Sequence, residues 1–296
     1  MAGAWCSPWS SAATSGPSIK FPVAAHDRIA IASYPFREFI AGPDHKAGNP
    51  VIALKDFAAH AIEKFGVHRI ELWSSHFPST DAKYLDQFRA AVTTARSAVV
   101  NIAVDGDACP YTADAAERER AIAFSKHWID VAVAIGSPSV RTSIPADKGH
   151  ATPDMERLAA SVRKVADYGA AKDVVVHLEN DNPLSEDPFL LEQLVEKVCA
   201  PWLRLLPDFC NTLAAHDADY AYRGIDTMFA HAYGICHVKD SEVSEKAEAV
   251  HVDLPRTFGI LKKHKYKGYC SMEYDMPGDP YPATAELVRK TVEFLS

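Results

Sequence analysis

The sequence predicts an α/β protein that closes into a single-domain (β/α)₈ TIM barrel. Short apolar runs rich in Val and Ile alternate with longer amphipathic stretches, and this alternation predicts a parallel sheet covered by helices. Eight such pairs are present, which is the number that a closed barrel contains, and 296 residues are enough to build it. The last four strand-like runs also recur at about the 30-residue interval that one strand–helix unit occupies.

The predicted strands are short, mostly apolar runs bounded by turn residues. They cover Ile29–Ser33, Arg69–Trp73, Val99–Val104, Ser139–Thr142, Val174–Leu178, Leu203–Pro207, Ile235–Val238 and Tyr269–Met272. Amphipathic stretches between them predict the helices. These cover Ala53–Lys64, Tyr84–Ala95, Ala113–Ile135, Pro153–Tyr168, Pro188–Val198, Asp217–Ala230, Pro255–Lys263 and Ala283–Leu295.

Capping signals mark several of these helices. Thr152-Pro153 and Asp187-Pro188 each place a capping side chain before a proline, as at the first turn of a helix. Gly66, Gly136 and Gly169 stand where helices are expected to end.

Residues 1–27 form an N-terminal arm, and the barrel is predicted over 28–296. The first 26 residues are rich in Ala, Ser and Pro and lack the basic start and apolar stretch of a secretory signal. Two interpretations stay open. A loose arm would suit a cytoplasmic protein, and the remnant of a trimmed export signal would suit a periplasmic one.

Composition limits the classes of partner. A formal net charge of −8 argues against duplex DNA and anionic membranes, both of which need a dense positive surface. No apolar run approaches the roughly 18 residues of a membrane span. We therefore expect a small-molecule substrate, with no nucleic-acid or membrane partner, and leave a homo-oligomer open.

Four strand-like runs each end in a metal-ligand residue type. Glu179, Asp208, His237 and Glu273 follow one another at intervals of 29, 29 and 36 residues. Since alternate residues of a strand share a face, all four also fall on the inward face of their strands. The C-terminal ends of barrel strands meet at one face, so the four side chains are predicted to converge there.

Three carboxylates and one imidazole form a site of mostly oxygen ligands. Such a site favours Mn²⁺, with Mg²⁺, Co²⁺ and Zn²⁺ as alternatives. A single acidic residue at a strand end is more often a helix cap or a salt-bridge partner. The agreement of spacing and strand parity at four positions is what favours a metal site.

At these residues the chain resembles the xylose isomerase-like TIM barrel superfamily, which includes sugar phosphate isomerases and epimerases and the family 2 AP endonucleases. The similarity rests on HLEN (177–180), PDFCN (207–211), HVKD (237–240) and YKGYCSMEYD (266–275). It implies that the four residues named above are the metal ligands. It also implies that the two glutamates, Glu179 and Glu273, move the substrate proton as catalytic residues.

The chain departs from the family pattern at some positions. Epimerases of this group often have His three residues after the metal Asp, where this chain has Asn211. At Lys239, in HVKD, the sequence resembles inosose dehydratases rather than ketose 3-epimerases. The additional histidines of the three-metal AP endonucleases are not matched, and this argues against a DNA-cleaving enzyme.

The resemblance and the ligand set together predict a divalent-metal-dependent sugar isomerase or epimerase. Such an enzyme removes a proton next to a carbonyl through a metal-stabilised enediolate. The alternative is a lyase or dehydratase on a keto sugar or cyclitol, including cleavage of 3-keto glycosides or C-glycosides, because the first half-reaction is shared. A non-catalytic sugar-binding barrel is disfavoured by the complete ligand set.

Further candidates lie near the strand ends. Lys239 is a candidate catalytic residue that could instead form a salt bridge at the barrel mouth. Predicted substrate-binding residues, each with plain packing or charge balance as the competing interpretation, are His177, Arg141, Asn211, Trp73, Glu71, Phe36 and His76.

Overall fold

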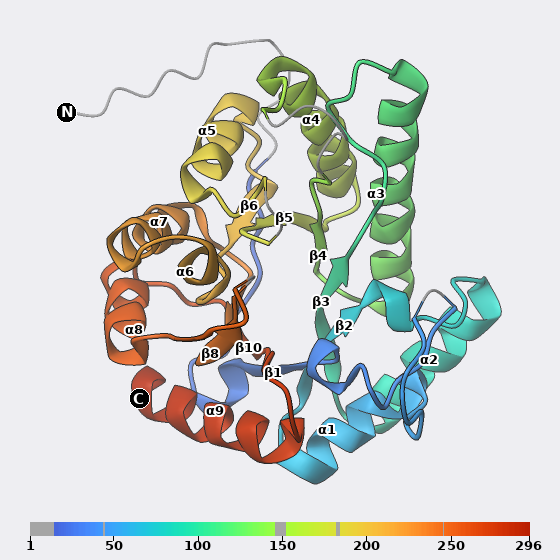
Figure 1. Ribbon diagram of the computed structural model, residues 1–296. Coiled ribbons are helices and arrows are strands. Elements are labelled where there is room, and N and C mark those ends of the chain that lie inside the picture. Colours follow the sequence, from blue (N-terminus) through green and yellow to red (C-terminus); the bar gives the residue numbers. More distant parts are fainter. Residues whose placement is uncertain (1–14, 44, 146–151, 182–183, 245) are drawn as a thin grey trace.

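A computed structural model describes residues 15–43, 45–145, 152–181, 184–244 and 246–296. Eight parallel strands form a ring, and the long helices lie outside it (Figure 1). The barrel strands are β1 (Ile29–Ala32), β2 (Arg69–Trp73), β3 (Ala98–Val104), β4 (Ser139–Thr142), β5 (Val175–Glu179), β6 (Leu203–Leu206), β7 (Ile235–Val238) and β10 (Tyr269–Met272). Each predicted strand is present, within one residue at either end.

The strand order is β6-β5-β4-β3-β2-β1-β10-β7, with every neighbouring pair parallel. Two single bridges, Leu205 with Ala232 and Asp208 with His237, join β6 to β7 and complete the ring. At the second bridge the His237 amide donates to Pro207, and the Phe209 amide donates to His237. The predicted (β/α)₈ barrel is confirmed.

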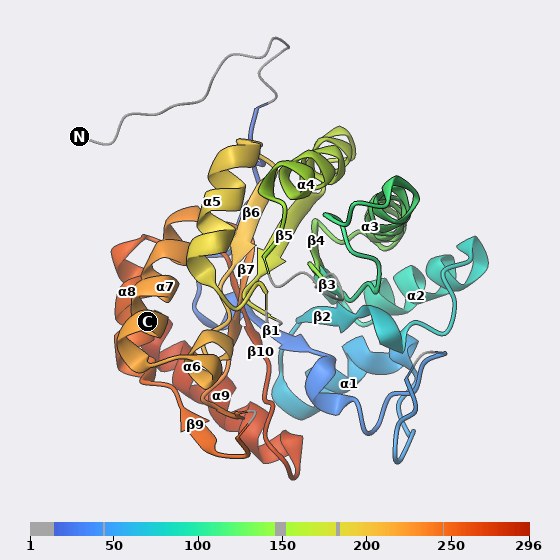
Figure 2. The same ribbon diagram turned by 45° about the horizontal axis from the view of Figure 1, so that its top comes forward.

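The long helices follow their strands as predicted, and Figure 2 shows them surrounding the ring from a second direction. They are α1 (Phe57–Phe65), α2 (Ala82–Thr94), α3 (Ala115–Ile135), α4 (Met155–Ala171), α5 (Pro188–Val198), α7 (Ala218–His231), α8 (Leu254–Lys263) and α9 (Pro280–Leu295). Gly66 and Gly136 end α1 and α3 in the left-handed conformation.

Two of the predicted boundaries of α4 are wrong. Asp154, not Thr152, caps the helix, because its side chain accepts from the Arg157 amide. Gly169 lies inside the helix rather than at its end. A Cβ there would lie 2.6 Å from the Val174 carbonyl oxygen, so the glycine allows close contact between α4 and the start of β5.

Seven helices begin at an aspartate whose carboxylate accepts from backbone amides of the first turn. The seven caps are Asp81, Asp114, Asp154, Asp187, Asp217, Asp253 and Asp279. Since each helix follows its strand, these N-termini face the same end of the barrel as the strand C-termini. Each carboxylate satisfies amides that a helix start leaves unpaired.

Some elements have no counterpart in the predicted pattern. The short helix α6 (Asn211–Ala215) follows β6, and a hairpin of β8 (Ser241–Val243) and β9 (Ala249–His251) follows β7. Three-residue 3₁₀ turns are η1 (His26–Arg28), η2 (Tyr34–Phe36), η3 (Leu54–Asp56) and η4 (Ser74–His76). Glu242 of β8 pairs with Asp275, so the hairpin lies over the end of β10.

The described part of the N-terminal arm packs against the other end of the barrel. Phe21 makes edge-to-face contacts with Tyr233 and Tyr269, and the Ile19 amide donates to the Tyr233 hydroxyl. Residues 1–14 lie outside the described residues, and the two interpretations of the arm stay predictions. None of the described helices combines the length and apolar character that crossing a membrane requires.

The interior of the barrel yields a stability prediction. At Gly234, before β7, a Cβ would lie 2.7 Å from Cε1 of the fully buried His177. Gly234→Ala is expected to lower the free energy of unfolding by about 1–3 kcal/mol, because the ring cannot move aside in a packed interior. Denaturant unfolding measures this.

The matched control is Gly259→Ala in α8, where a Cβ meets nothing within 4 Å. It is expected to raise the free energy of unfolding by about 0.5–1 kcal/mol, since alanine is the better helix former. Equal effects of the two substitutions would contradict the packing described here.

Candidate metal centre

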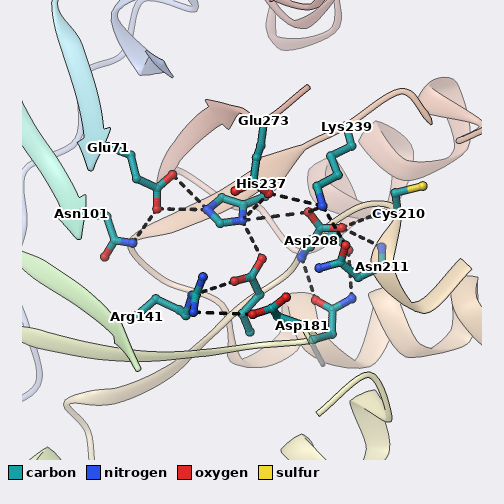
Figure 3. Close-up of polar contacts among 12 residues, drawn as sticks. Glu71, Asn101, Arg141, Asp181, Asp208, Cys210, Asn211, His237, Lys239 and Glu273 are labelled. Atoms are coloured by element: carbon teal, nitrogen blue, oxygen red, sulfur yellow. Dashed lines mark hydrogen bonds and ion pairs between the residues drawn. The ribbon is translucent and has the colours of Figure 1, made fainter. Parts of the chain in front are cut away.

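The four predicted ligands meet at the C-terminal end of the barrel. One ligand atom from each of Glu179, Asp208, His237 and Glu273 lies within 4.8 Å of the other three, and all four residues are buried. They come from β5, the residues after β6, β7 and the residue after β10. Figure 3 shows His237 at the centre of this group. The geometry therefore brings together residues that are far apart in the sequence.

One ring nitrogen of His237 faces the carboxylates. Its Nδ1 lies 2.6 Å from Glu179 Oε1, 3.1 Å from Glu273 Oε2 and 4.0 Å from Asp208 Oδ2. This nitrogen is the ring atom that would ligate a metal.

The other ring nitrogen of His237 is held by a buried polar chain. Nε2 lies 2.9 Å from Glu71 Oε2, and Glu71 Oε1 accepts from the Asn101 amide at 2.7 Å. The Ser139 hydroxyl donates to Asn101 at 2.7 Å. A carboxylate that accepts from one nitrogen of a histidine fixes the ring and leaves the other nitrogen for a metal.

Asp208 has one satisfied and one unsatisfied oxygen. Oδ1 accepts from the backbone amides of Cys210 and Asn211 at 2.8 and 2.7 Å, which caps the start of α6. Oδ2 is buried and accepts no hydrogen bond; the nearest cation, the Lys239 ammonium, is 3.5 Å away. A buried carboxylate oxygen without a hydrogen-bond donor is costly, and a cation among the four residues would satisfy it. The donor set of three carboxylates and one imidazole thus fits a divalent ion.

The electrostatics of the cluster also favour a cation. Burial raises the pKa of Glu179 to about 7, despite the nearby charges of His237 and Arg141. Burial alone would lower the pKa of His237, but the charges of Glu179, Glu273 and Glu71 raise it well above its usual value. The protein without metal therefore retains a proton in this cluster at neutral pH.

Two buried cations flank the carboxylates. Arg141 Nε lies 2.8 Å from Glu179 Oε2, and its Nη1 forms ion pairs with Asp105 and Asp181. Lys239 Nζ donates to Asn211 at 2.8 Å and lies 3.5 Å from Glu273 Oε2. Both cations hold the orientation of a proposed ligand.

A cavity of about 240 Å³ opens beside the cluster. A volume of this size suits a small ligand. Its walls are polar, and they consist of Tyr34, Trp73, Ala103, Asp105, Arg141, Glu179, Asp181, Asn211, Lys239, Glu242, Glu273 and Asp275. Two of the four clustered residues, Glu179 and Glu273, therefore face the space where a substrate would lie.

A family model described as "Xylose isomerase-like TIM barrel" matches residues 59–296. The chain belongs to this family. The resemblance predicted from HLEN, PDFCN, HVKD and the C-terminal motif is confirmed. No curated protein matches the chain by sequence.

Solved structures show the same fold at low sequence identity. A xylose isomerase-like TIM barrel protein from Mycobacterium smegmatis in complex with magnesium has a TM-score of 0.72 and 16% identity, over 92% of this chain and 98% of its own. The D-psicose 3-epimerase of Clostridium cellulolyticum H10 with D-tagatose has a TM-score of 0.67 and 17% identity, over 90% of this chain and 96% of its own. The 3-keto-D-glucoside 4-epimerase of E. coli has a TM-score of 0.66 and 13% identity, over 89% of this chain and 98% of its own.

Three of the seven predicted substrate-binding residues line the cavity beside the four clustered residues. They are Arg141, Asn211 and Trp73. Lys239, predicted as catalytic, also lies in its wall. Trp73 Nε1 donates to Asp105 at 2.6 Å, which holds the indole at the edge of the cavity.

The other four predicted substrate-binding residues do not line the cavity. Glu71 is buried beneath His237, and His177 lies one layer deeper in the barrel beside Gly234. Phe36 packs in an aromatic cluster with Phe57, Phe65 and Tyr281 between the barrel and its outer helices.

His76 is also fully buried, and its Nδ1 lies 3.0 Å from the Ser33 hydroxyl. Burial lowers its pKa to about 3, so it is neutral. These four placements share a cause: strand parity and proximity to a strand end show which face a residue is on, but not its depth.

Four acidic residues of the cavity were missed by the analysis of the sequence. They are Asp105, Asp181, Glu242 and Asp275. Asp105, Asp181 and Asp275 come one to three residues after a strand, so the strand-end signal could have found them. Glu242 could not be found this way, because it depends on the β8–β9 hairpin.

The contact between Glu71 and His237 predicts that a substitution at Glu71 lowers metal affinity. Glu71→Gln removes the charge that orients and polarises the ring, so Mn²⁺ affinity is expected to fall about 10- to 100-fold. Calorimetric titration of the metal-free protein measures this. The exposed Glu63→Gln on α1 is the control and should leave affinity unchanged. Wild-type affinity in Glu71→Gln would refute the role of Glu71.

Metal affinity is also expected to depend on pH. The raised pKa of His237 means that the metal must displace a proton from the cluster. Affinity should therefore rise with pH, by about tenfold per pH unit while one proton is released. Calorimetric titrations in buffers of different ionisation enthalpy measure the number of protons released when the metal binds. Affinity that is constant from pH 6 to pH 8 would contradict this account.

Proposed function

We propose that this protein is a divalent-metal-dependent sugar isomerase or epimerase that removes a proton next to a carbonyl. The observation that carries the proposal is the buried cluster of Glu179, Asp208, His237 and Glu273 beside a polar cavity. Membership of the xylose isomerase-like family and the fold shared with sugar 3- and 4-epimerases support it.

The four clustered residues would hold the ion, and we propose Mn²⁺, with Mg²⁺, Co²⁺ and Zn²⁺ as alternatives. When bound, a divalent cation polarises a carbonyl and stabilises the negative charge that develops beside it. The chain supplies the remaining parts: a cavity that fits a sugar, acceptors for its hydroxyls and two carboxylates that can carry a proton.

Glu179 and Glu273 are suited to move that proton. They reach the cavity from β5 and β10, and β6 and β7 lie between these strands in the ring. One carboxylate can therefore remove a proton from one face of the substrate carbon while the other approaches from a different direction. Return of the proton to the opposite face gives epimerisation, and return to the neighbouring carbon gives isomerisation.

Arg141 and Lys239 influence the charge states of these two carboxylates. Arg141 lies against Glu179, and Lys239 lies against Glu273. Burial alone would raise the pKa of Glu273, but the charges of His237 and Lys239 lower this pKa to about 2. In the protein without metal, Glu273 is thus ionised at neutral pH, whereas Glu179, with a pKa of about 7, is partly protonated.

A lyase or dehydratase acting on a keto sugar or cyclitol is the second candidate. It is favoured by Lys239, whose ammonium group lies in the cavity wall beside Glu273 and Asn211. A cation there can stabilise an oxygen that leaves from the carbon next to the one deprotonated. Proton removal is the first step in both candidate reactions.

Solvent deuterium separates these functions. The metal-loaded protein is incubated in D₂O with ketoses, inososes and 3-keto glycosides. Deuterium in a recovered isomer supports the isomerase or epimerase, and loss of water or of an aglycone supports the lyase. No exchange into any of these compounds would refute both proposals.

Glu273→Gln tests the proton-carrying role. Gln retains an oxygen for the metal but cannot accept the proton. Turnover is expected to fall by about 10²- to 10⁴-fold while metal content stays close to that of the wild type. Deuterium exchange and elemental analysis measure the two effects. Unchanged turnover would exclude Glu273 as the base.

A further inference from the structure

Resting on the proposed function, we infer that this cavity is specific for uncharged, polyhydroxylated substrates and rejects those carrying phosphate or carboxylate groups. The inference rests on the charge of the cavity wall, the pairing of its cations and the capping of the helix N-termini around it.

Carboxylates dominate the wall outside the proposed metal ligands. Four of them, Asp105, Asp181, Glu242 and Asp275, come from four separate segments after β3, β5, β7 and β10. Against them the described residues of the wall include two cations, Arg141 and Lys239. With Glu179, Asp208 and Glu273 also present, a divalent ion leaves the whole site with an excess of negative charge.

Both cations of the wall are already paired with several carboxylates. Arg141 pairs with Asp105, Glu179 and Asp181. Its guanidinium is therefore not available to a phosphate without breaking an internal ion pair.

Lys239 is paired to the same extent. It lies 3.1 Å from Glu242 Oε2 and 3.5 Å from both Asp208 Oδ2 and Glu273 Oε2. A third cation nearby, Arg37, lies 2.7 Å from Asp275 and 4.4 Å from the centre of the Tyr34 ring. It too is engaged by a carboxylate of the wall.

Most of the described helix N-termini, the usual binding sites for phosphate at this face of a barrel, are occupied by side chains, with α1 as an exception. The seven aspartate caps described above accept from the first-turn amides of α2, α3, α4, α5, α7, α8 and α9. Asp208 Oδ1 does the same at α6, beside the cavity. At these helix starts a carboxylate stands where a phosphate would bind.

The carboxylates of the wall favour hydroxyl donors, because they accept hydrogen bonds from hydroxyl groups without requiring a new charge. Tyr34 in the same wall is neutral, because burial, more than the charges around it, raises its pKa to about 12. Anions are disfavoured by Coulomb repulsion in a partly dehydrated site.

The test compares a neutral ketohexose with its 1- and 6-phosphates on the metal-loaded, full-length protein. Binding is measured by calorimetry, and proton abstraction by deuterium exchange. The free sugar is expected to bind at least about tenfold more tightly than either phosphate, with a smaller ratio at high salt.

Charge-removing variants show which residues are responsible. The double substitution Asp181→Asn and Glu242→Gln is expected to reduce the ratio of affinities by about threefold or more, by strengthening phosphate binding. Glu293→Gln removes one exposed carboxylate near the end of α9 and should leave the ratio as in the wild type.

The outcomes separate this inference from the proposed function. If a phosphate binds as tightly as the free sugar, the inference is overturned even when exchange confirms the enzyme. If no sugar exchanges deuterium but the affinity ratio is as expected, the proposed function fails and the charge selectivity stands. An unchanged ratio in the double variant would overturn the role of these carboxylates.

Discussion

The structure depends on one electrostatic constraint, the burial of three carboxylates around a single imidazole. Like charges that are this close and this deep repel strongly unless a proton or a metal ion neutralises them. The surrounding residues reduce this repulsion without removing it. Arg141 and Lys239 form ion pairs with the cluster on the side of the cavity, and Glu71 holds His237 from the barrel interior through a hydrogen bond. One Asp208 oxygen still lacks a hydrogen-bond donor.

The barrel makes this arrangement achievable. Parallel strands end at one face, so residues separated by about thirty positions in the chain become neighbours. The helices that follow the strands point their N-termini at the same face, and in this chain aspartates satisfy most of them. The result, among the residues that the structure describes, is a site with few cations, each already paired, and many acceptors for hydroxyl groups.

Much of the fold and part of the site could be predicted from the sequence. Runs such as Val174–Leu178 identify strands because both of their faces are covered, and the ligand positions followed from strand parity. Depth was not accessible, so His177 and Phe36 were predicted to bind substrate although both lie away from the cavity. Glu242 was missed because the hairpin that carries it has no periodic signal, and Thr152 was preferred to the true cap Asp154 because it precedes a proline.

The closure of the barrel between β6 and β7 has a wider consequence. The strands on either side are joined by two single bridges, and one of them links Asp208 to His237. The two residues that close the barrel are thus also two of the four proposed metal ligands. Because backbone groups of Pro207, Phe209 and His237 form this bridge, closing the barrel fixes the distance between the two positions and leaves both side chains available to an ion.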